Sequence, residues 1–578
     1  MTGDPTSEEA SGSYNRRAFV SLLSALGVTG IAGCSGGDGD GTDTGTDDGA
    51  DDGTDNGSTA TPDSTPTQPP PEPNTVDPLT YDRPGDATVV FGEGVDGLSK
   101  IMSSAGGSTS IADSWELNSD DEGEYAITIT GGNTGYTQPE HEDVHLHVEW
   151  KPPDYAGQAS GQQSGNSGVF MSNLYEVQVL NNYQNDATYG AGFAGSLYED
   201  APAMVDPARP PTEWQAYDII WRNPEFDEDE NLVSPAACTV FFNGVCVLPH
   251  MNVRGPNFGG VSPYSYHEAA PVQLQDHGGQ STDQGSTSDI RWRNIWMQDI
   301  PSYSEDARST FYSSYERKSE FQGNTSREDS YNYVLQDYNK RYTDPYREDA
   351  FDFGGQYGPP PVNPGSEPDK DGASPPGDAN LSTPPTDATI LLDGNTSDGF
   401  DGEWNAQEEW VTVEPGAGNL TTTDSFGDSQ VHVEFRIPEG TENPDSGVLL
   451  HENFEVQIAG EGTGAEGTGA YTYQTAPLRD ATKSAGEWQT LDLIWQAPEV
   501  ADGQAVPGRV TALLNGQVVQ HRLYIDGPNA DGEVGNYLDV SGQGAAEPIA
   551  LQENGSEVDF RFVWARELYP EELREGYQ

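Results

Sequence analysis

The residues best suited to chemistry lie on one alternating segment that the chain uses twice. In the first copy Glu176 and Gln178 alternate with valines, and in the second copy Glu455 and Gln457 alternate with a valine and an isoleucine. Such alternation is typical of a β-strand, whose successive side chains point to opposite faces of a sheet. The apolar residues can then enter a core, while a carboxyl that can carry a proton and an amide that can hydrogen-bond lie side by side on the other face.

A merely solvated outer face is the alternative interpretation of this segment, because antiparallel sheets often keep one face in water. Each copy, however, begins with a Ser-Gly-Val turn, at Asn166 and at Asp445, and each has an aromatic residue just before the glutamate. Two copies of one arrangement argue for a face with a function.

Several other short motifs recur in the same order in both halves of the chain. They are His147-Val-Glu-Trp150 with His432-Val-Glu-Phe435, Glu213-Trp214 with Glu487-Trp488, Asn243-Gly244 with Asn515-Gly516, and Gly255-Pro-Asn257 with Gly527-Pro-Asn529. Short alternating segments separate these motifs, and helical periodicity is nearly absent, which predicts a two-sheet sandwich in each half. We therefore expect an all-β protein with tandem sandwiches at residues 85–302 and 386–570. A solenoid would need more and shorter repeats.

The composition limits the partners that the chain can have. It has 578 residues, with Lys+Arg 26 against Asp+Glu 96, so the formal net charge is −70. A field of this sign repels phosphate, which argues against nucleic acid as a partner. We interpret the excess of acidic residues as an adaptation to high salt, where dissolved ions screen the repulsion between the negative charges. Calcium binding is the competing hypothesis, but no loop has the Asp-x-Asp-x-Asp-Gly pattern with a closing glutamate.

The N-terminal region predicts export. Asn15-Arg16-Arg17 precedes a short apolar run and is a twin-arginine pattern, and Cys34 ends a lipobox-like sequence. We expect residues 1–34 to be a lipoprotein signal, so that the protein is extracellular and held at the cell surface by a lipid on Cys34. A spanning helix is the alternative, but the apolar run is too short and is broken by glycines.

Two segments have too few apolar residues to form a core. Residues 35–84 are mostly Gly, Asp, Thr and Pro and predict a disordered acidic linker. Residues 303–385 predict a connector that is disordered in part, with a helix expected from Ser326 to Tyr342.

The remaining two cysteines, Cys238 and Cys246, flank the Asn243-Gly244 turn. A two-residue hairpin there pairs Phe241 with Cys246 and places Cys238 on the opposite side of the sheet. This geometry disfavours a disulfide, whereas an oxidising compartment favours one. We lean toward free thiols and leave the question open.

Taken together, the motifs resemble the 3-keto-disaccharide hydrolase domain family. The residues that carry the resemblance are Asn166-Ser-Gly-Val-Phe170, Tyr175-Glu-Val-Gln178, Ala201-Pro202, Glu213-Trp214, Asn243-Gly244, Gln275-Asp-His-Gly278 and Arg293-Asn294-Ile295. The resemblance covers both halves and implies a concanavalin-like jelly-roll sandwich, distantly related to laminarinase-type glycoside hydrolases. The laminarinase pattern itself is incomplete, because Gln178 replaces its middle aspartate and no second glutamate follows. Ordinary retaining hydrolysis therefore lacks its carboxylate pair.

The resemblance implies a 3-keto sugar as substrate. Its ketone acidifies the hydrogen on C2, so that elimination followed by hydration needs one base, one group that polarises the ketone and one proton donor. We nominate His277 as the base, Glu176 as the acid or a metal ligand, and Arg293 as the polariser, with base and acid open to exchange. The residues expected to bind the sugar are Asn166, Gln178, Trp214 and Asn294 in the first half and Glu455 and Gln457 in the second.

The second half departs from this pattern, since Asn554 stands where the first half has His277. An amide cannot act as a base, so we expect catalysis in the first half. A non-catalytic carbohydrate-binding or adhesion lipoprotein is the rival hypothesis, because sandwiches of this kind also bind sugars without chemistry. A divalent metal is possible and no cofactor is established. The glycan, its linkage and the oligomeric state stay open.

Overall fold

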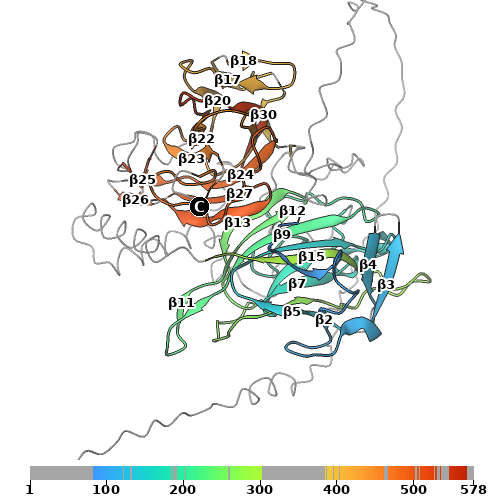
Figure 1. The fold of residues 1–578 in the computed structure, drawn as a ribbon. Coiled ribbons are helices and arrows are strands. Elements are labelled where there is room, and N and C mark those ends of the chain that lie inside the picture. The colour runs from blue at the N-terminus through green and yellow to red at the C-terminus, as the bar shows by residue number, and fades with distance from the viewer. Residues whose placement is uncertain are drawn as a thin grey trace, which may run out of the picture. The chain divides into compact units, whose positions relative to one another are not determined.

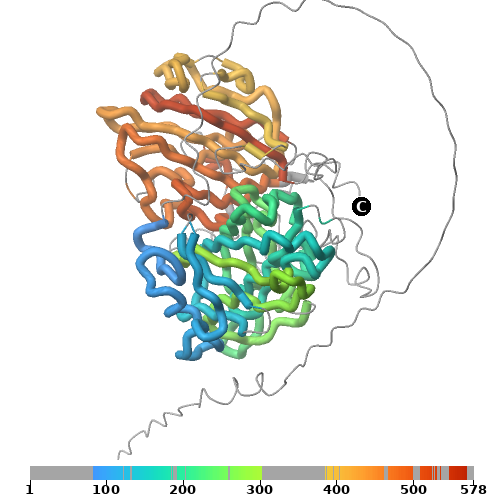
Figure 2. The backbone as a smooth tube through the Cα atoms, turned by 90° about the vertical axis from the view of Figure 1, so that its right-hand side faces the viewer, coloured from blue at the N-terminus to red at the C-terminus, as the bar shows by residue number. Residues whose placement is uncertain are grey.

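In a computed structural model the protein forms two tandem all-β sandwiches. The structure describes residues 83–301 and 384–568, except for gaps at 121–122, 130–132, 184, 186–191, 202, 258–260, 386, 395, 403, 461, 463–466, 502–503, 507, 526, 530–533 and 536–545. Each half of the chain forms its own pair of sheets, blue to green for the first and yellow to red for the second (Figures 1 and 2). The only helices within the described ranges are short 3-10 turns, η2 (Ile111–Asp113), η3 (Ala156–Gln158) and η4 (Gly161–Gln163).

The first sandwich has a large and a small antiparallel sheet. The large sheet has the order β13-β12-β9-β6-β15-β4-β3, with β1 also paired to β15. Its strands are β1 (Thr88–Phe91), β3 (Trp115–Asp120), β4 (Gly123–Thr128), β6 (Val144–Lys151), β9 (Gln215–Arg222), β12 (Ala237–Phe242), β13 (Val245–Asn252) and β15 (Arg291–Asp299). The small sheet has the order β2-β5-β14-β7-β8, with β2 (Ile101–Met102), β5 (Gly135–His141), β7 (Ser167–Met171), β8 (Tyr175–Val179) and β14 (Ala270–Leu274). A separate hairpin joins β10 (Glu225–Phe226) to β11 (Leu232–Ser234).

The second sandwich repeats this topology. Its large sheet has the order β18-β19-β30-β21-β24-β27-β28, with β16 paired to β30. The strands are β16 (Thr389–Leu392), β18 (Asn405–Ala406), β19 (Val411–Thr412), β21 (Ser429–Arg436), β24 (Gln489–Gln496), β27 (Arg509–Leu514), β28 (Gln517–Tyr524) and β30 (Asp559–Glu567). The small sheet has the order β17-β20-β29-β22-β23, with β17 (Phe400–Asp401), β20 (Leu420–Phe426), β22 (Asp445–Leu450), β23 (Phe454–Ala459) and β29 (Glu547–Leu551). The hairpin β25 (Glu499–Ala501) to β26 (Gln504–Val506) corresponds to β10–β11. The predicted duplication of one fold is therefore confirmed.

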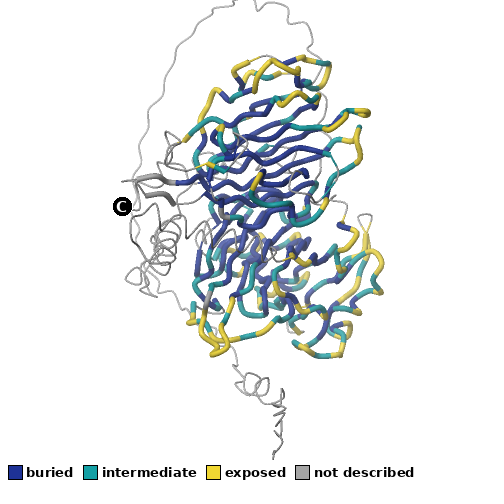
Figure 3. The backbone as a smooth tube through the Cα atoms, turned by 60° about the vertical axis from the view of Figure 1, so that its left-hand side comes forward, coloured by how far each residue is buried: buried dark blue, intermediate teal, exposed yellow. Residues whose placement is uncertain are grey.

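A core fills the space between the two sheets of each sandwich. Along β6, Val144, Leu146, Val148 and Trp150 enter the core, so the alternate residues face outward from the large sheet. On β8, Tyr175, Val177 and Val179 enter the same core, which turns Glu176 and Gln178 to the outer face of the small sheet. Buried positions follow the strands and exposed ones follow the turns (Figure 3). The alternation in the sequence thus predicted the inward and outward faces correctly.

The hairpin between β12 and β13 settles the state of the cysteines in this structure. Asn243 and Gly244 have φ angles of 51° and 80°, as a two-residue turn between antiparallel strands requires. Phe241 pairs with Cys246, as expected, while a register shift pairs Cys238 with Met251. Both cysteines are free and buried, with Cys238 in the core between the sheets.

Several sequence-based predictions concern residues outside the described ranges. These are the signal at 1–34 with Cys34, nearly all of the linker at 35–84, and the helix within the connector at 303–385. Among the residues that the structure describes, no helix has the length and apolar character needed to cross a membrane.

Candidate functional site

Glu176 lies in a row of outward-facing side chains that crosses the small sheet of the first sandwich. Strand register pairs Tyr136 with Gln273, Gln273 with Phe170, and Phe170 with Glu176. On the far side of β8, the backbone N–H of Tyr198 donates to the Glu176 carbonyl at 3.0 Å. The row therefore sets a carboxyl among aromatic rings and an amide, the mixture typical of small-molecule sites.

Gly168 makes room for the Glu176 carboxyl. A Cβ atom at Gly168 would overlap Oε1 of Glu176 and lie 2.7 Å from Cε2 of Phe170. The equivalent glycine of the second sandwich, Gly447, has Cγ of Glu455 at 3.0 Å from the same position. The Ser-Gly-Val motif of the sequence is thus explained by a glutamate that folds across the neighbouring strand.

Asn257 holds the backbone of Glu176 from outside the sheet. Its Oδ1 accepts from the Glu176 N–H at 2.6 Å, and its Nδ2 donates to the Glu176 carbonyl at 3.2 Å. Asn529 makes the same two bonds to Glu455, at 2.7 and 3.2 Å. The repeated Gly-Pro-Asn motif was visible in the sequence, but its role was missed because the partner lies about 80 residues away along the chain.

The surroundings of the Glu176 carboxyl favour its protonated form. Burial is the main cause, and together with the charge of Glu199 it raises the pKa of Glu176 to about 8. The residue is only 5% exposed, and no described residue hydrogen-bonds its carboxyl. A buried carboxyl with a raised pKa can hold a proton for donation to a ligand.

Three of the predicted site residues, Asn166, Gln178 and His277, are joined by a chain of contacts that includes Gln162. The sequence did not identify Gln162. Nδ2 of Asn166 lies 3.5 Å from Nε2 of His277 and donates to Oε1 of Gln162 at 3.0 Å. Nε2 of Gln178 donates to the same oxygen, also at 3.0 Å. Gln162 comes from the short η4 turn, which carries no strand periodicity, so no pattern in the sequence identified it.

The hydrogen bonds of His277 fix its tautomer when it is neutral. Nδ1 lies 2.8 Å from the carbonyl of Gly278, which can only accept, so Nδ1 carries the hydrogen. Nε2 then keeps its lone pair and faces the Asn166 amide. This is the form in which an imidazole acts as a base.

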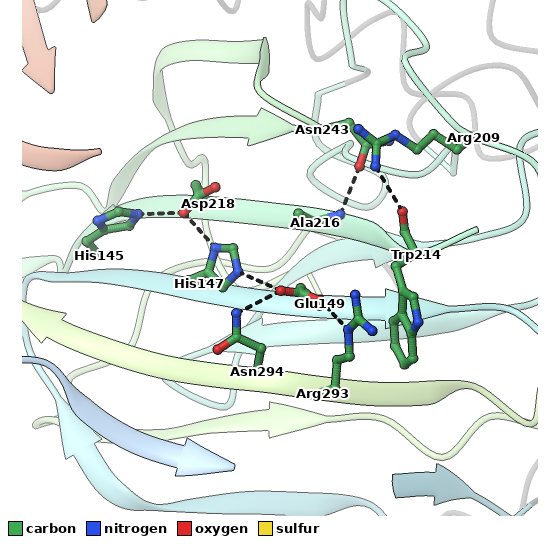
Figure 4. Close-up of polar contacts among 10 residues, drawn as sticks. All are labelled: His145, His147, Glu149, Arg209, Trp214, Ala216, Asp218, Asn243, Arg293 and Asn294. Atoms are coloured by element: carbon green, nitrogen blue, oxygen red, sulfur yellow. Dashed lines mark hydrogen bonds and ion pairs between the residues drawn. The ribbon is translucent and has the colours of Figure 1, made fainter. Parts of the chain in front are cut away.

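The structure places Arg293, Asn294 and Trp214 on the other sheet. Arg293 forms an ion pair with Glu149, which is its register partner on β6, and its guanidinium lies 4.1 Å from the centre of the Trp214 ring (Figure 4). Nδ2 of Asn294 donates to the same glutamate at 2.7 Å. These three residues therefore lie together on the outer face of the large sheet, whereas Glu176, Gln178, Asn166 and His277 belong to the small sheet and its loops.

The cluster around Glu149 continues as a buried ionic network (Figure 4). Oδ1 of Asp218 lies 2.9 Å from both Nε2 of His145 and Nδ1 of His147. Although burial acts in the opposite direction, the charge of Asp218 and the bonds to both carboxylates raise the pKa of His147 to about 9. Burial by itself would raise the pKa of Glu149. Bonding to His147 and the charge of Arg293 outweigh burial and hold this pKa below its usual value.

The second sandwich repeats the centre of this ionic network, although Gln430 and Phe562 stand where the first sandwich has His145 and Asn294. Nδ1 of His432 lies 2.7 Å from Asp492, Arg561 pairs with Glu434 at 2.6 Å, and Arg561 lies 4.1 Å from the Trp488 ring centre. The pKa of His432 is also raised to about 9, where the charge of Asp492 overcomes the effect of burial. Its presence in both halves marks the network as part of the fold.

The small sheet of the second sandwich, in contrast, has a different polar face. Asp445 replaces Asn166 and accepts from Nε2 of Gln457 at 2.9 Å and from Nδ2 of Asn554 at 2.7 Å. The row through Glu455 holds Leu449, Ala550 and Thr421 where the first sandwich holds Phe170, Gln273 and Tyr136. Among the described residues of the two faces, the glutamate, the following glutamine and the glycine beside the glutamate are shared, whereas the rest of the row differs.

Within the described ranges, no group of three or more His, Cys, Asp or Glu side chains has the arrangement of a metal site. The sequence suggested Glu176 as a possible metal ligand, with a glutamine and a histidine, Gln178 and His277, as the other oxygen and nitrogen donors of such a site. Their fit to a metal thus has no support from a further His, Cys, Asp or Glu ligand among the described residues.

The fold defines the class of the protein as a concanavalin-like β-sandwich, present twice in the chain. Comparison with family models is more specific. Residues 103–298 and 387–566 both match the 3-keto-alpha-glucoside-1,2-lyase-like domain, so the chain belongs to that family in two tandem copies. Its function is therefore related to carbohydrate. No curated protein matches the chain.

Solved structures with a similar fold include three candidate glycosyl hydrolases from Parabacteroides distasonis ATCC 8503. One has 32% identity, covers 37% of this chain and 84% of its own, and has a TM-score of 0.32. A second has 16% identity, covers 31% of this chain and 94% of its own, and has a TM-score of 0.23. The carbohydrate-binding module CBM66 from Bacillus subtilis has 9% identity, covers 31% of this chain and 95% of its own, and has a TM-score of 0.17.

Proposed function

We propose that the first sandwich cleaves 3-keto-glycosides by elimination and hydration, on the outer face of its small sheet. His277 takes the proton from C2 of the sugar through Nε2. The glycosidic bond at C1 then breaks, and the Glu176 carboxyl gives its proton to the leaving oxygen. Water adds across the C1=C2 bond, with Glu176 accepting a proton from the water and His277 returning one to C2. The net reaction is hydrolysis, and both side chains recover their starting states.

The observation that carries this proposal is the burial of Glu176 on the outer face of the small sheet, where its carboxyl folds over Gly168. A carboxyl that acts as a general acid must hold its proton at the working pH, and burial with the charge of Glu199 raises the pKa of Glu176 to about 8. The neutral form of His277 supplies the complementary lone pair. One acid and one base of this kind suit elimination next to a ketone, and the family match to a 1,2-lyase-like domain supports the same chemistry.

Arg293 has no part in this proposal. Its guanidinium is committed to Glu149 and Trp214 on the large sheet, and Arg561 makes the same contacts in the second sandwich. Because both sandwiches hold an arginine in the same contacts, Arg293 does not explain a reaction that only the first sandwich carries out.

We further propose that the protein is an exported lipoprotein, anchored at the cell surface through Cys34. The support is the twin-arginine pattern followed by the lipobox-like sequence. Labelling cells with a radioactive fatty acid tests this proposal. Label on the wild type that is absent from Cys34→Ser supports the anchor, and equal labelling of both rejects it.

Isotopic substitution tests the reaction itself. The purified protein is given a 3-keto-α-glucoside that carries deuterium at C2, in about 1 M KCl to screen its charge. The proposal expects cleavage with a primary isotope effect and loss of deuterium to solvent. The matched variant His277→Asn introduces the residue of the second sandwich and should lose cleavage. Cleavage with neither an isotope effect nor any loss of deuterium contradicts the proposal, and binding of the sugar without any cleavage favours a carbohydrate-binding protein.

A further inference from the structure

Two neighbouring strands in the large sheet of the first sandwich carry like charges where they meet. Lys151 is the last residue of β6, and its register partner is Arg291, the first residue of β15. Both side chains lie on the outer face of the sheet, since Trp150 and Trp292 beside them enter the core. Like charges directly opposite each other destabilise a pair of strands. In a chain with Lys+Arg 26 against Asp+Glu 96, two facing cations need an explanation.

The second sandwich has opposite charges at the equivalent place. Arg436 at the end of β21 is the register partner of Asp559 at the start of β30. Nε and Nη2 of Arg436 both donate to Oδ2 of Asp559, at 3.0 and 2.6 Å. On the next strand, the hydroxyl of Thr412 donates to Oδ1 of Asp559 at 2.7 Å. One carboxylate thus satisfies the polar groups of this place from within the protein.

The first sandwich lacks this carboxylate. The register of the strands puts Arg291 in the place of Asp559 and Ile127 in the place of Thr412. No described residue forms an ion pair or a hydrogen bond with the Lys151 ammonium, although Lys151 is only 8% exposed. A lysine is rarely buried to this extent without a partner. The place therefore suits a carboxylate-like group that the protein itself does not supply.

The contacts that Lys151 and Arg291 do make leave their N–H groups available. Nζ of Lys151 lies 5.5 Å from the centre of the Trp214 ring, and Cζ of Arg291 lies 5.8 Å from the centre of the Tyr125 ring. Such contacts stabilise the charge of a cation but do not supply a hydrogen-bond acceptor of the usual kind. Arg291 also donates to Oδ1 of Asp154 at 3.5 Å, but the side chain of Asp154 is 57% exposed. An exposed ion pair of this length contributes little.

The aromatic rings keep the two cations together. The rings of Tyr125 and Trp214 meet edge to face, with their centres 6.1 Å apart, so the cations lie over one aromatic pair. Arg293 lies on the same face but is committed to Glu149 (Figure 4). Lys151 and Arg291 therefore remain as two adjacent cations without a shared carboxylate.

We propose that Lys151 and Arg291 bind an oxyanion carried by a saccharide, in the place that the Asp559 carboxylate takes in the second sandwich. The group is a carboxylate or a sulfate ester, since either can accept from a lysine and an arginine at once. The saccharide part of the inference rests on the link of the family to carbohydrate and not on cleavage of 3-keto-glycosides. The site belongs to the large sheet, whereas Glu176 and His277 belong to the small sheet and its loops.

Calorimetric titration of the full chain tests the site. The probes are tetragalacturonate, a sulfated galactotetraose and neutral galactotetraose, in about 1 M KCl, which screens buried charges less than exposed ones. We expect at least one acidic probe to bind about tenfold or more tightly than the neutral probe. Tighter binding of tetragalacturonate identifies a carboxylate, and tighter binding of the sulfated probe identifies a sulfate ester. Equal affinity for all three probes, or no binding of either acidic probe, overturns the inference.

A substitution that copies the second sandwich tests the residues. Arg291→Asp gives Lys151 a facing carboxylate, so it should lower the affinity for the acidic probe about tenfold or more, at an unchanged or higher midpoint of thermal unfolding, Tm. Arg83→Asp is the matched control, because Arg83 is exposed in the same sandwich and the change in net charge is equal. The control should keep the wild-type affinity. Undiminished binding by Arg291→Asp, or an equal loss in both variants, overturns the inference.

Lys151→Met separates binding from folding, because it keeps a buried apolar stem and removes the ammonium. We expect the same loss of affinity at an unchanged or higher Tm, since a buried charge without a partner is removed. Wild-type affinity in Lys151→Met overturns the inference even if Arg291→Asp fails to fold. A wild type that binds an acidic probe through these residues but cleaves no 3-keto-glycoside upholds this inference, while the proposed function fails.

Discussion

Glu176 folds its carboxyl across the α-carbon of Gly168 on the neighbouring strand, where a methyl group would overlap its Oε1. We therefore predict that Gly168→Ala displaces the carboxyl and abolishes cleavage. The overpacking should also cost about 1–3 kcal/mol in the free energy of unfolding. Gly447→Ala is the control, because it crowds Glu455 and leaves the first sandwich untouched. Steady-state rates corrected for the folded fraction check the prediction, and equal losses in both variants contradict it.

Asn257 fastens the backbone of Glu176 with two hydrogen bonds, so we predict that Asn257→Ala frees this part of β8. Losing two buried bonds should cost about 1–3 kcal/mol. Hydrogen exchange at the Glu176 amide should become faster, while the Glu455 amide, which Asn529 holds, keeps its rate. An unchanged exchange rate at the Glu176 amide would show that β8 holds its position without the two Asn257 hydrogen bonds.

The two buried histidine networks make stability fall at alkaline pH. His147 and His432 have folded pKa values of about 9, above the ordinary value of 6.5. The stability gained from their charged forms is fully present below the unfolded pKa and is lost as pH rises through about 9. We predict that His147→Gln with His432→Gln flattens the decline in Tm between pH 7 and pH 10. A slope equal to that of the wild type rejects this prediction.

Substitution of Arg293 tests whether the outer face of the large sheet takes part in the reaction. Replacing it with alanine removes one partner of the buried Glu149, which keeps His147 and Asn294, so the free energy of unfolding should fall by about 1–3 kcal/mol. Arg561→Ala breaks the corresponding pair with Glu434 and should cost a similar amount. Because neither arginine lies on the small sheet, kcat per folded molecule should change little in either variant. A loss of kcat in Arg293→Ala alone would contradict this prediction and would support Arg293 as the residue that polarises the ketone.

Much of the fold could be predicted because its signals are local. Alternation placed Glu176 and Gln178 outward, and the Asn243-Gly244 turn gave the pairing of Phe241 with Cys246. The register shift that moves Cys238 opposite Met251 could not be predicted, since a bulge depends on contacts with other strands.

The site was predictable only in part, because it joins distant segments. Asn166, Gln178 and His277 were identified from motifs, and the structure brings them together through Gln162. Gln162 and Glu199 lie in turns without periodicity, and their importance comes from tertiary contacts alone. The alternation around Arg293 is compatible with either face of either sheet. The sequence therefore did not reveal that Arg293 lies beside Glu149.

The most direct measurement compares Glu176→Gln with Glu455→Gln in the full chain, using a 3-keto-α-glucoside and detecting the released aglycone. The two substitutions are isosteric and remove the same acid from equivalent strands, so differences in folding are controlled. We predict that Glu176→Gln lowers kcat by about 10²-fold or more, while Glu455→Gln keeps the wild-type rate. Equal rates for Glu176→Gln and the wild type, or a loss only in Glu455→Gln, would contradict a reaction centred on Glu176.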